Sequence, residues 1–192
     1  MKKSILFILL IAVFSLTNVV SAKSSTGIFA VSKEDVKASK SLLEQHEYKG
    51  LTMKYPSNWV KAEQKNSNSQ FFLLKSDSTD DFKASMNILI DVSTPYLALM
   101  PLDFFAGQYM QKMQADGYSS IEFIRVEKGK WQGHAALYSE YKAVYMEHSI
   151  HCVQYMVDNG KNMFVITFAS SENEWDITKM DMQKMLASIV IR

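Results

Sequence analysis

The feature that most constrains the fold is a pair of alternating runs on either side of an Asn-Gly dipeptide. The side chains of residues 153–158 change character with a two-residue period, which is the period of a β-strand. Asn159-Gly160 follows, and this dipeptide tolerates the positive φ values of a tight hairpin turn. Residues 163–168 then carry apolar side chains on both faces, as in a strand that is covered on both sides. The sequence therefore predicts a β-hairpin whose second strand is central in a sheet.

Residues 1–22 have the three parts of a secretory signal. Lys2 and Lys3 make a basic start, residues 5–14 are an unbroken apolar run, and Val20-Ser21-Ala22 offers small residues for a signal peptidase. We expect cleavage after Ala22 and export to the periplasm or the medium. An uncleaved anchor is the alternative, but a spanning helix needs about 18 to 20 apolar residues. We therefore expect no membrane span in the mature chain.

The mature chain, residues 23–192, is long enough to form one domain with a hydrophobic core. Loss of Lys2 and Lys3 removes two of 21 basic residues, so the 20 acidic residues then outnumber them and the net charge is about −1. A nucleic-acid-binding protein would normally carry a basic excess, and we expect no nucleic-acid partner.

Cys152 is the single cysteine, which excludes an internal disulfide. We expect a buried, unreactive thiol, with dimerisation as the alternative.

Periodicity divides the chain in the order helix, strands, helix, strands, helix. We expect a flexible lead over residues 23–30 and a short helix over 32–45 that Ser32 caps, so that residues 23–47 precede the main domain at 48–192. The other helices are predicted at 101–116 and 176–188. Expected strands cover 48–55, 60–64 pairing back on it, 71–75, 85–93, 119–127, 131–145, 146–157 and 190–191, with a turn at 128–130. Consecutive strands favour antiparallel pairing and an α+β fold.

Residues 50–59 suggest a family. Their sequence, GLTMKYPSNW, ends in the pattern aromatic-Pro-x-x-Trp and resembles the opening hairpin of PsbP-like domains, a group that includes the DcrB-type periplasmic proteins. Later landmarks agree: Gly133 with Ala135, Gln154-Tyr155, Asn159-Gly160, Thr167-Phe168 and Ser188-Ile189. The resemblance spans residues 48–191 and implies an α/β/α sandwich around a central antiparallel sheet. Its members are mainly accessory or binding proteins without a shared catalytic set, so no catalytic residue is carried over.

The densest group of reactive residue types is His148, His151 and Cys152. On a strand, His148 and Cys152 share a face but stand about 13 Å apart, while His151 points to the opposite face. Joint metal ligation or a Cys–His nucleophile would therefore require a β-bulge. The arrangement nearest to a site pairs His148 with Tyr141 or Glu140 on the neighbouring strand. The alternative is a structural role for all of them, which the geometry favours.

Other candidate motifs are weak. Asp77, Asp80 and Asp81 could gather a cation, but their loop lacks the ligand spacing of a Ca²⁺ hand, which favours a solvated turn. His46 and His134 are isolated, and we expect them at the surface. Neither a nucleophile elbow nor a Gly-rich phosphate loop occurs in the sequence. We therefore predict no catalytic residue, no metal and no cofactor.

The uncharged connector at residues 94–101, TPYLALMP, is the candidate binding segment. We expect Leu99 to be buried and Tyr96 and Leu97 to be partly exposed, where they could contact a partner or a lipid. The sequence as a whole favours an exported, non-enzymatic accessory or binding protein with a protein partner in the cell envelope. An envelope carrier of a lipid or small apolar ligand is the alternative. A hydrolase using His148 or Cys152 is the third hypothesis.

Overall fold

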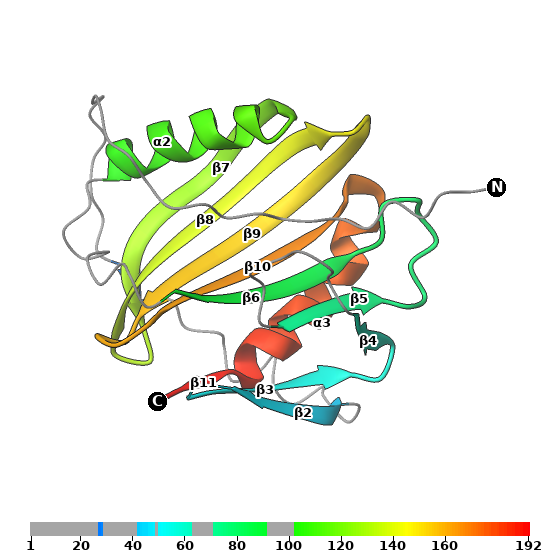
Figure 1. Cartoon of the computed structure of the whole chain (residues 1–192). Coiled ribbons are helices and arrows are strands. Elements are labelled where there is room, and N and C mark those ends of the chain that lie inside the picture. The colour runs from blue at the N-terminus through cyan, green and yellow to red at the C-terminus, as the bar shows by residue number, and fades with distance from the viewer. Residues whose placement is uncertain (1–26, 29–41, 49, 63–70, 92–101) are drawn as a thin grey trace.

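The computed structural model describes residues 27–28, 42–48, 50–62, 71–91 and 102–192 (Figure 1). In this part of the chain an 8-stranded sheet has the order β1-β7-β8-β9-β10-β6-β5-β4, and a 3-stranded sheet has the order β11-β3-β2. The strands of the large sheet are β1 (Gly27–Ile28), β4 (Trp59–Lys61), β5 (Phe71–Lys75), β6 (Ser85–Asp91), β7 (Tyr118–Trp131), β8 (His134–Tyr145), β9 (His148–Asp158) and β10 (Met163–Ser171). The remaining elements are β2 (Leu42–Tyr48), β3 (Leu51–Pro56), α2 (Leu102–Ala115), η2 (Glu172–Glu174), α3 (Trp175–Ser188) and β11 (Val190–Ile191).

The predicted hairpin is confirmed as β9 and β10. Gly160 has φ 82° at the turn, and the side-chain oxygen of Asn159 accepts hydrogen bonds from the backbone of Lys161 at 3.0 Å and Asn162 at 2.8 Å. Every residue of β10 is buried, and β10 pairs with β9 on one side and β6 on the other. The two-sided apolar pattern therefore marked a central strand, as expected.

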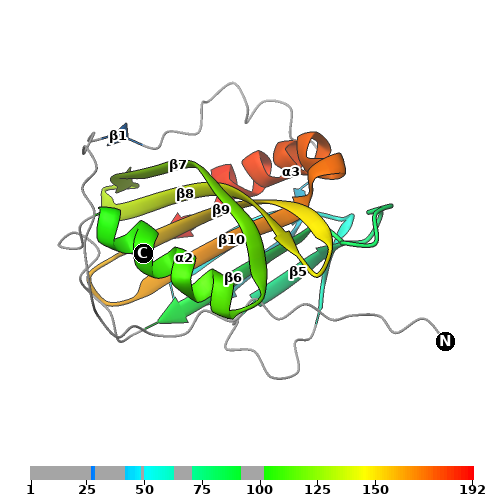
Figure 2. The ribbon, with the colours of Figure 1, turned by 90° about the horizontal axis from the view of Figure 1, so that it is seen from above.

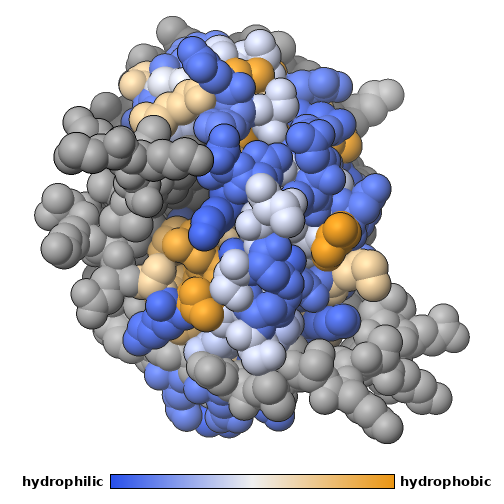
Figure 3. Space-filling model, turned by 90° about the vertical axis from the view of Figure 1, so that its right-hand side faces the viewer, coloured by the Kyte–Doolittle hydropathy of each residue, from blue (hydrophilic) through white to orange (hydrophobic). Residues whose placement is uncertain are grey.

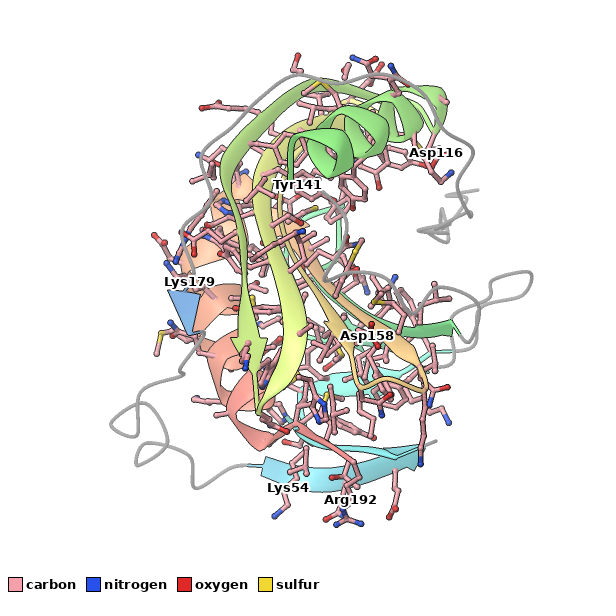
Figure 4. All side chains as sticks on the ribbon, turned by 90° about the vertical axis from the view of Figure 1, so that its left-hand side faces the viewer. Lys54, Asp116, Tyr141, Asp158, Lys179 and Arg192 are labelled. Carbon is pink, nitrogen blue, oxygen red and sulfur yellow. The ribbon has the colours of Figure 1, made fainter. Side chains whose placement is uncertain are left out.

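Among the described elements, α2 and α3 lie over opposite faces of the large sheet (Figure 2). On one face, Phe164 and Phe168 of β10 share a core with Met185 of α3. On the other face, Tyr141 of β8 belongs to a cluster with Met113 of α2, and Figure 4 shows Tyr141 beside α2. The α+β fold on an antiparallel sheet is thus confirmed, with β1 as the parallel exception. On the side drawn in Figure 3, the coloured part of the surface is mainly hydrophilic, with some small hydrophobic patches.

The small sheet corrects one predicted pairing. Residues 60–64 were expected to pair back on the strand at 48–55, but β4 pairs with β5, while β3 pairs with β2 and β11. The chain leaves β3 at Pro56, and the carbonyl of Asn58 then accepts the backbone N–H of Ser76 at 2.7 Å. The Asn58 amide also donates to Asp77 at 3.1 Å. These bonds hold the segment after Pro56 against the end of β5, so β3 and β4 enter different sheets.

The N-terminal predictions are partly wrong. The helix expected over residues 32–45 is wrong at its end, because Leu42–Tyr48 is strand β2, whose Gln45 pairs with Lys54 of β3. Pairing with a neighbouring strand overrides the weak local helix propensity. Within the expected flexible lead, Gly27–Ile28 is a short strand in parallel register with Gly129 and Lys130. The rest of residues 23–41 lies outside the described part.

The turn predicted at 128–130 is also wrong, because β7 continues to Trp131. The chain reverses at Gln132 and Gly133, with φ 52° and 86°. A positive φ is unfavourable for glutamine, but both polar atoms of the Gln132 side-chain amide are hydrogen-bonded. The amide nitrogen donates to the carbonyl of Ile189 at 2.5 Å, and the amide oxygen accepts from the backbone N–H of Ile191 at 3.1 Å. A tertiary contact therefore places this turn.

A second turn was missed between β8 and β9. Met146 and Glu147 have φ 45° and 72°, the conformation of a two-residue hairpin turn. The sequence offers no glycine there, so the prediction continued a strand through both residues. At the C-terminus the predictions are confirmed: Met182, Met185, Leu186 and Ile189 are buried, and Val190–Ile191 pairs with β3 as an edge strand.

Candidate functional site

A row of buried polar side chains crosses the face of the large sheet that carries α2. Ser139 of β8 pairs in register with Gln154 of β9, Gln154 pairs with Thr167 of β10, and Thr167 pairs with Asn87 of β6. Since paired residues on neighbouring strands point to the same face, the four side chains stand in line. We call Ser139, Gln154, Thr167 and Asn87 the polar row.

The polar row is buried but not fully hydrogen-bonded. Its side chains range from Gln154, 0% exposed, to Asn87, 5% exposed. The Gln154 amide nitrogen donates to the hydroxyl of Thr167 at 3.0 Å. Among the described residues, no partner faces the side-chain oxygens of Asn87, Gln154 and Ser139. Buried polar atoms in folded proteins are almost always paired, so three unpaired oxygens in one row call for an explanation.

A small pocket adjoins the row. Asn87 and Thr167 line it together with Ser85. The rest of its wall is aromatic or apolar: Phe72, Phe82, Tyr118, Ile150 and Ala169. None of these lining residues carries a charge. The pocket encloses about 20 Å³, which is room for a water molecule beside a few polar atoms.

Apolar clusters lie on either side of the polar row along the strands. The tyrosine cluster contains the buried residues Phe82, Met113, Tyr118, Tyr141, Ala143, Ile150, Cys152 and Ala169. The methionine cluster contains Leu137, Met156, Met163 and Val165. On β10, for example, Val165 precedes Thr167 and Ala169 follows it. The face beneath α2 thus has a polar centre and apolar flanks.

Burial keeps Tyr109, Tyr141 and Cys152 on this face neutral. Burial raises the pKa of Tyr109 and Tyr141 well above the usual value of a phenol, and their hydroxyl oxygens lie 3.4 Å apart. Burial likewise raises the pKa of the Cys152 thiol to about 12. Cys152 is 0% exposed, which confirms the predicted buried thiol. A protonated, enclosed thiol is a poor nucleophile.

A second polar cluster lies on the opposite face, around His151. One ring nitrogen of His151 is 2.8 Å from a carboxylate oxygen of Glu140, and the other is 3.0 Å from one of Glu172. The ring stacks on Trp175 at 3.7 Å between centroids and 7° between planes. Lys142 donates to Glu172 at 2.8 Å. These contacts join β8 and β9 to the start of the C-terminal helical segment.

Hydrogen bonds keep both carboxylates of this cluster ionised. Burial acts to raise the pKa of Glu140, but its hydrogen bonds with Tyr138 and His151 outweigh this effect, and the pKa is lowered. The same balance, through hydrogen bonds with Lys142 and His151, lowers the pKa of Glu172. Both nitrogens of His151 already face carboxylates, so neither is available to act as a base on a substrate. We interpret the cluster as a structural clamp.

The structure therefore corrects the predicted histidine pairing. His148 was paired with Tyr141 or Glu140, but it stands opposite Tyr145, with its ring 6.0 Å from that of Phe82. The residue that meets Glu140 is His151, because the register aligns His151 with Lys142 and leaves Glu140 within reach along β8. The separation of His151 and Cys152 onto opposite faces is as predicted.

Asp77 and Asp80 accept hydrogen bonds that hold the 77–81 loop in place. Asp77 accepts from Lys75 at 2.5 Å and from Asn58, and Asp80 accepts the backbone N–H of Phe82 at 3.3 Å. Among the described residues no group of three His, Cys, Asp or Glu is placed to hold a metal ion.

His134 is partly exposed. The side chains of His46, Tyr96, Leu97 and Leu99 lie outside the described part, and their assignments stay predictions.

Sequence reasoning missed the polar row. Gln154 and Thr167 entered the prediction only through alternating runs and as landmarks of the resemblance, and Asn87 and Ser139 were not singled out. The usable signal was a polar residue with less polar residues two positions to either side: Ser139 between Leu137 and Tyr141, Gln154 between Cys152 and Met156, and Thr167 between Val165 and Ala169. Periodicity shows which face each of them takes, but only the pairing register shows that they meet.

No family model and no curated protein matches the sequence. Solved structures do match. Cyanobacterial PsbP (CyanoP) from Synechocystis sp. PCC 6803 has a TM-score of 0.63 and 17% identity, over 80% of this chain and 95% of that chain. LpqN, involved in cell envelope biogenesis of Mycobacterium tuberculosis, has a TM-score of 0.56 and 10% identity, over 81% of this chain and 94% of that chain. The resemblance predicted from residues 48–191 is confirmed at the level of the fold, which is PsbP-like.

Within the described residues, no helix combines the length and the apolar character needed to cross a membrane.

Proposed function

We propose that this chain is an exported accessory protein of the cell envelope that binds a ligand beneath α2 and catalyses no reaction. The observation that carries the proposal is the polar row, whose oxygens on Asn87, Gln154 and Ser139 have no partner among the described residues. Each unpaired buried polar atom costs about 1–3 kcal/mol. A face selected for stability alone would pair these atoms or replace them, whereas sites for ligands often keep such costs.

Two further observations support binding over catalysis. The thiol of Cys152 is enclosed and its pKa is raised, and both ring nitrogens of His151 are occupied by carboxylates.

The N-terminal pattern of residues 1–22 supports export. LpqN, which has the same fold, is involved in cell envelope biogenesis, and this supports an envelope role. We also interpret the helices on the two faces of the large sheet as the outer layers of an α/β/α sandwich.

Native mass spectrometry of the protein purified from its host envelope, without detergent, tests the proposal. The wild-type protein should carry an added mass that is lost on denaturation. Ala169→Leu should abolish it, because Ala169 lines the pocket and a larger side chain fills the space. Ala187→Leu makes the same change at an exposed position of α3 and should retain the added mass.

Thermal melts accompany both variants, since overpacking in a well-packed core costs about 1–3 kcal/mol. If the wild-type protein carries no added mass, or if folded Ala169→Leu carries as much as the wild type, the proposed site beneath α2 is wrong.

An envelope carrier of a lipid or small apolar ligand is the second candidate function. The tyrosine and methionine clusters favour it, because they place apolar side chains on both sides of the polar row. A carrier must also give up its ligand. Transfer of the co-purified molecule from the protein to acceptor vesicles, followed by mass spectrometry of the vesicles, separates a carrier from a protein that only retains its ligand.

A further inference from the structure

The ring of His151 lies between two hydrogen-bond acceptors. Its Nε2 is 2.8 Å from an oxygen of Glu140, and its Nδ1 is 3.0 Å from an oxygen of Glu172. Burial acts to raise the pKa of both carboxyls, but their hydrogen bonds outweigh this effect and the pKa of each is lowered. An ionised carboxylate accepts hydrogen bonds and cannot donate them. Both contacts are therefore hydrogen bonds only when His151 carries a proton on each nitrogen and is a cation.

The second oxygen of each carboxylate has a donor of its own. The hydroxyl of Tyr138 donates to Glu140 at 2.6 Å, and the ammonium group of Lys142 donates to Glu172 at 2.8 Å. With His151 as a cation, two positive charges balance the two carboxylates. Because His151 is only 4% exposed, loss of a ring proton leaves a nitrogen lone pair facing a carboxylate in a place that water hardly reaches, which is unfavourable.

Other charges act on this cluster from a distance. They act on Glu140 or Lys142, and the residues concerned are Glu122 and Arg125 of β7 and Lys179 of α3, which Figure 4 labels on the side of the sheet away from α2. On β10 the residue in register with His151 is Ser170, whose hydroxyl donates to a backbone carbonyl. Among the described residues, the two carboxylates are thus the hydrogen-bond partners of the ring.

The two carboxylates differ in exposure, and this difference decides which contact opens. The side chain of Glu140 is 18% exposed and that of Glu172 is 32% exposed. Water solvates the more exposed carboxylate more readily, and Lys142 stays bound to it. A His151 ring with one proton therefore keeps its Nε2–H on Glu140 and presents the lone pair of Nδ1 to Glu172.

The contact with Glu172 fixes the start of the C-terminal helix. Glu172 is the first residue of η2, which joins β10 to α3, and the His151 ring stacks on Trp175, the first residue of α3. We propose that Glu140, His151 and Glu172 form a proton-operated latch. With two ring protons His151 fastens η2 and the first turn of α3 to β8 and β9, and loss of the Nδ1 proton to solvent releases Glu172. The latch lies on the face opposite the proposed site beneath α2 and does not depend on it.

NMR of the histidine rings in the ¹⁵N-labelled protein tests the latch from about pH 5 to about pH 9, a range that spans the charge change of histidine. His151→Gln identifies the signals of His151 among the four histidines. At the acidic end of its titration both ring nitrogens should carry a proton. At the alkaline end Nε2 should keep its proton and Nδ1 should lose it.

Amide hydrogen exchange measures the release. As His151 loses its proton, the amides of η2 and the first turn of α3 should exchange about tenfold faster relative to their intrinsic rates, because a hydrogen bond to a charged group changes an equilibrium by at least about that factor. Amides in the last turn of α3 should not follow the titration.

Variants assign the effect to the latch. Glu172→Gln removes the charge, and its amide can donate to a ring nitrogen without a proton, so exchange in η2 should no longer follow His151. Glu174→Gln is the matched control, because this carboxylate accepts from the backbone of Thr79 at 2.6 Å and Asp80 at 3.3 Å and should leave the coupling intact. His151→Gln has no titrating ring at this position and should also lose the coupling, so it decides if Glu172→Gln fails to fold.

A His151 ring that keeps both protons, or lacks one, over the whole pH range would overturn this inference. Exchange in η2 that ignores the titration of His151 would do the same, as would an equal effect of Glu172→Gln and Glu174→Gln.

Discussion

Removal of the unpaired amide of Asn87 should make the protein more stable. The side chain lies on β6 between Phe72 of β5 and Thr167 of β10, and its oxygen has no partner among the described residues. Leucine has a similar volume and suits a strand better than asparagine. Asn87→Leu therefore removes an unpaired acceptor and adds apolar contact without opening a cavity.

The size of the effect follows from the burial of the site. An unpaired buried acceptor costs about 1–3 kcal/mol, and Asn87 is 5% exposed, so most of this cost should be recovered. We expect the free energy of unfolding to rise by about 1–2 kcal/mol. For a domain of this size, about 1 kcal/mol shifts Tm by roughly 2–4 °C, so Tm should rise by about 2–8 °C.

Urea unfolding of the ligand-free protein, followed by tryptophan fluorescence, measures the change. Thr178→Val is the matched control: the hydroxyl of Thr178 is also unpaired in the described structure and fully buried in α3, so this variant should gain stability too. A loss of more than about 1 kcal/mol in Asn87→Leu, with the gain retained in Thr178→Val, would refute the reasoning. It would mean that the Asn87 oxygen is paired in solution.

Three further predictions concern Cys152, the His151 cluster and the N-terminus. Cys152 should react slowly with a thiol reagent in the folded protein and fast in denaturant, because its thiol is buried and its pKa is raised to about 12; rapid labelling of the native state would contradict this. The lowered pKa values of Glu140 and Glu172 stabilise the folded state above their ordinary value of 4.5, and this stability should be lost as the pH falls through the folded-state values. Urea unfolding at pH 7 and pH 4 should show the loss, and Glu140→Gln should reduce it; an equal loss in that variant would exclude the cluster as its source. The intact mass of the exported protein should begin at Lys23, and a mass that includes residues 1–22 would show that the signal is not cleaved.

Local pattern predicted much of the fold. The Asn-Gly turn, the doubly apolar strand at 163–168 and the buried side of the C-terminal helix are all found as expected, because each depends on residues that are close in sequence. The main errors have a common physical origin. The turn at Gln132 is held by the backbone of Ile189 and Ile191, and the strand Leu42–Tyr48 is held by its pairing with β3. Neither contact is visible in a local window.

The candidate site was less predictable than the fold. The sequence alone determined which residues are apolar and which face of a strand each one takes, since a strand alternates with a fixed period. It did not determine the register between strands, and the register decides which polar residues stand side by side. Only the tertiary structure brought Asn87 and Thr167 into one row with Gln154, and placed His151 between Glu140 and Glu172. Because a shift of one residue would send each side chain to the opposite face, both clusters exist only through the pairing of strands that lie far apart in the chain.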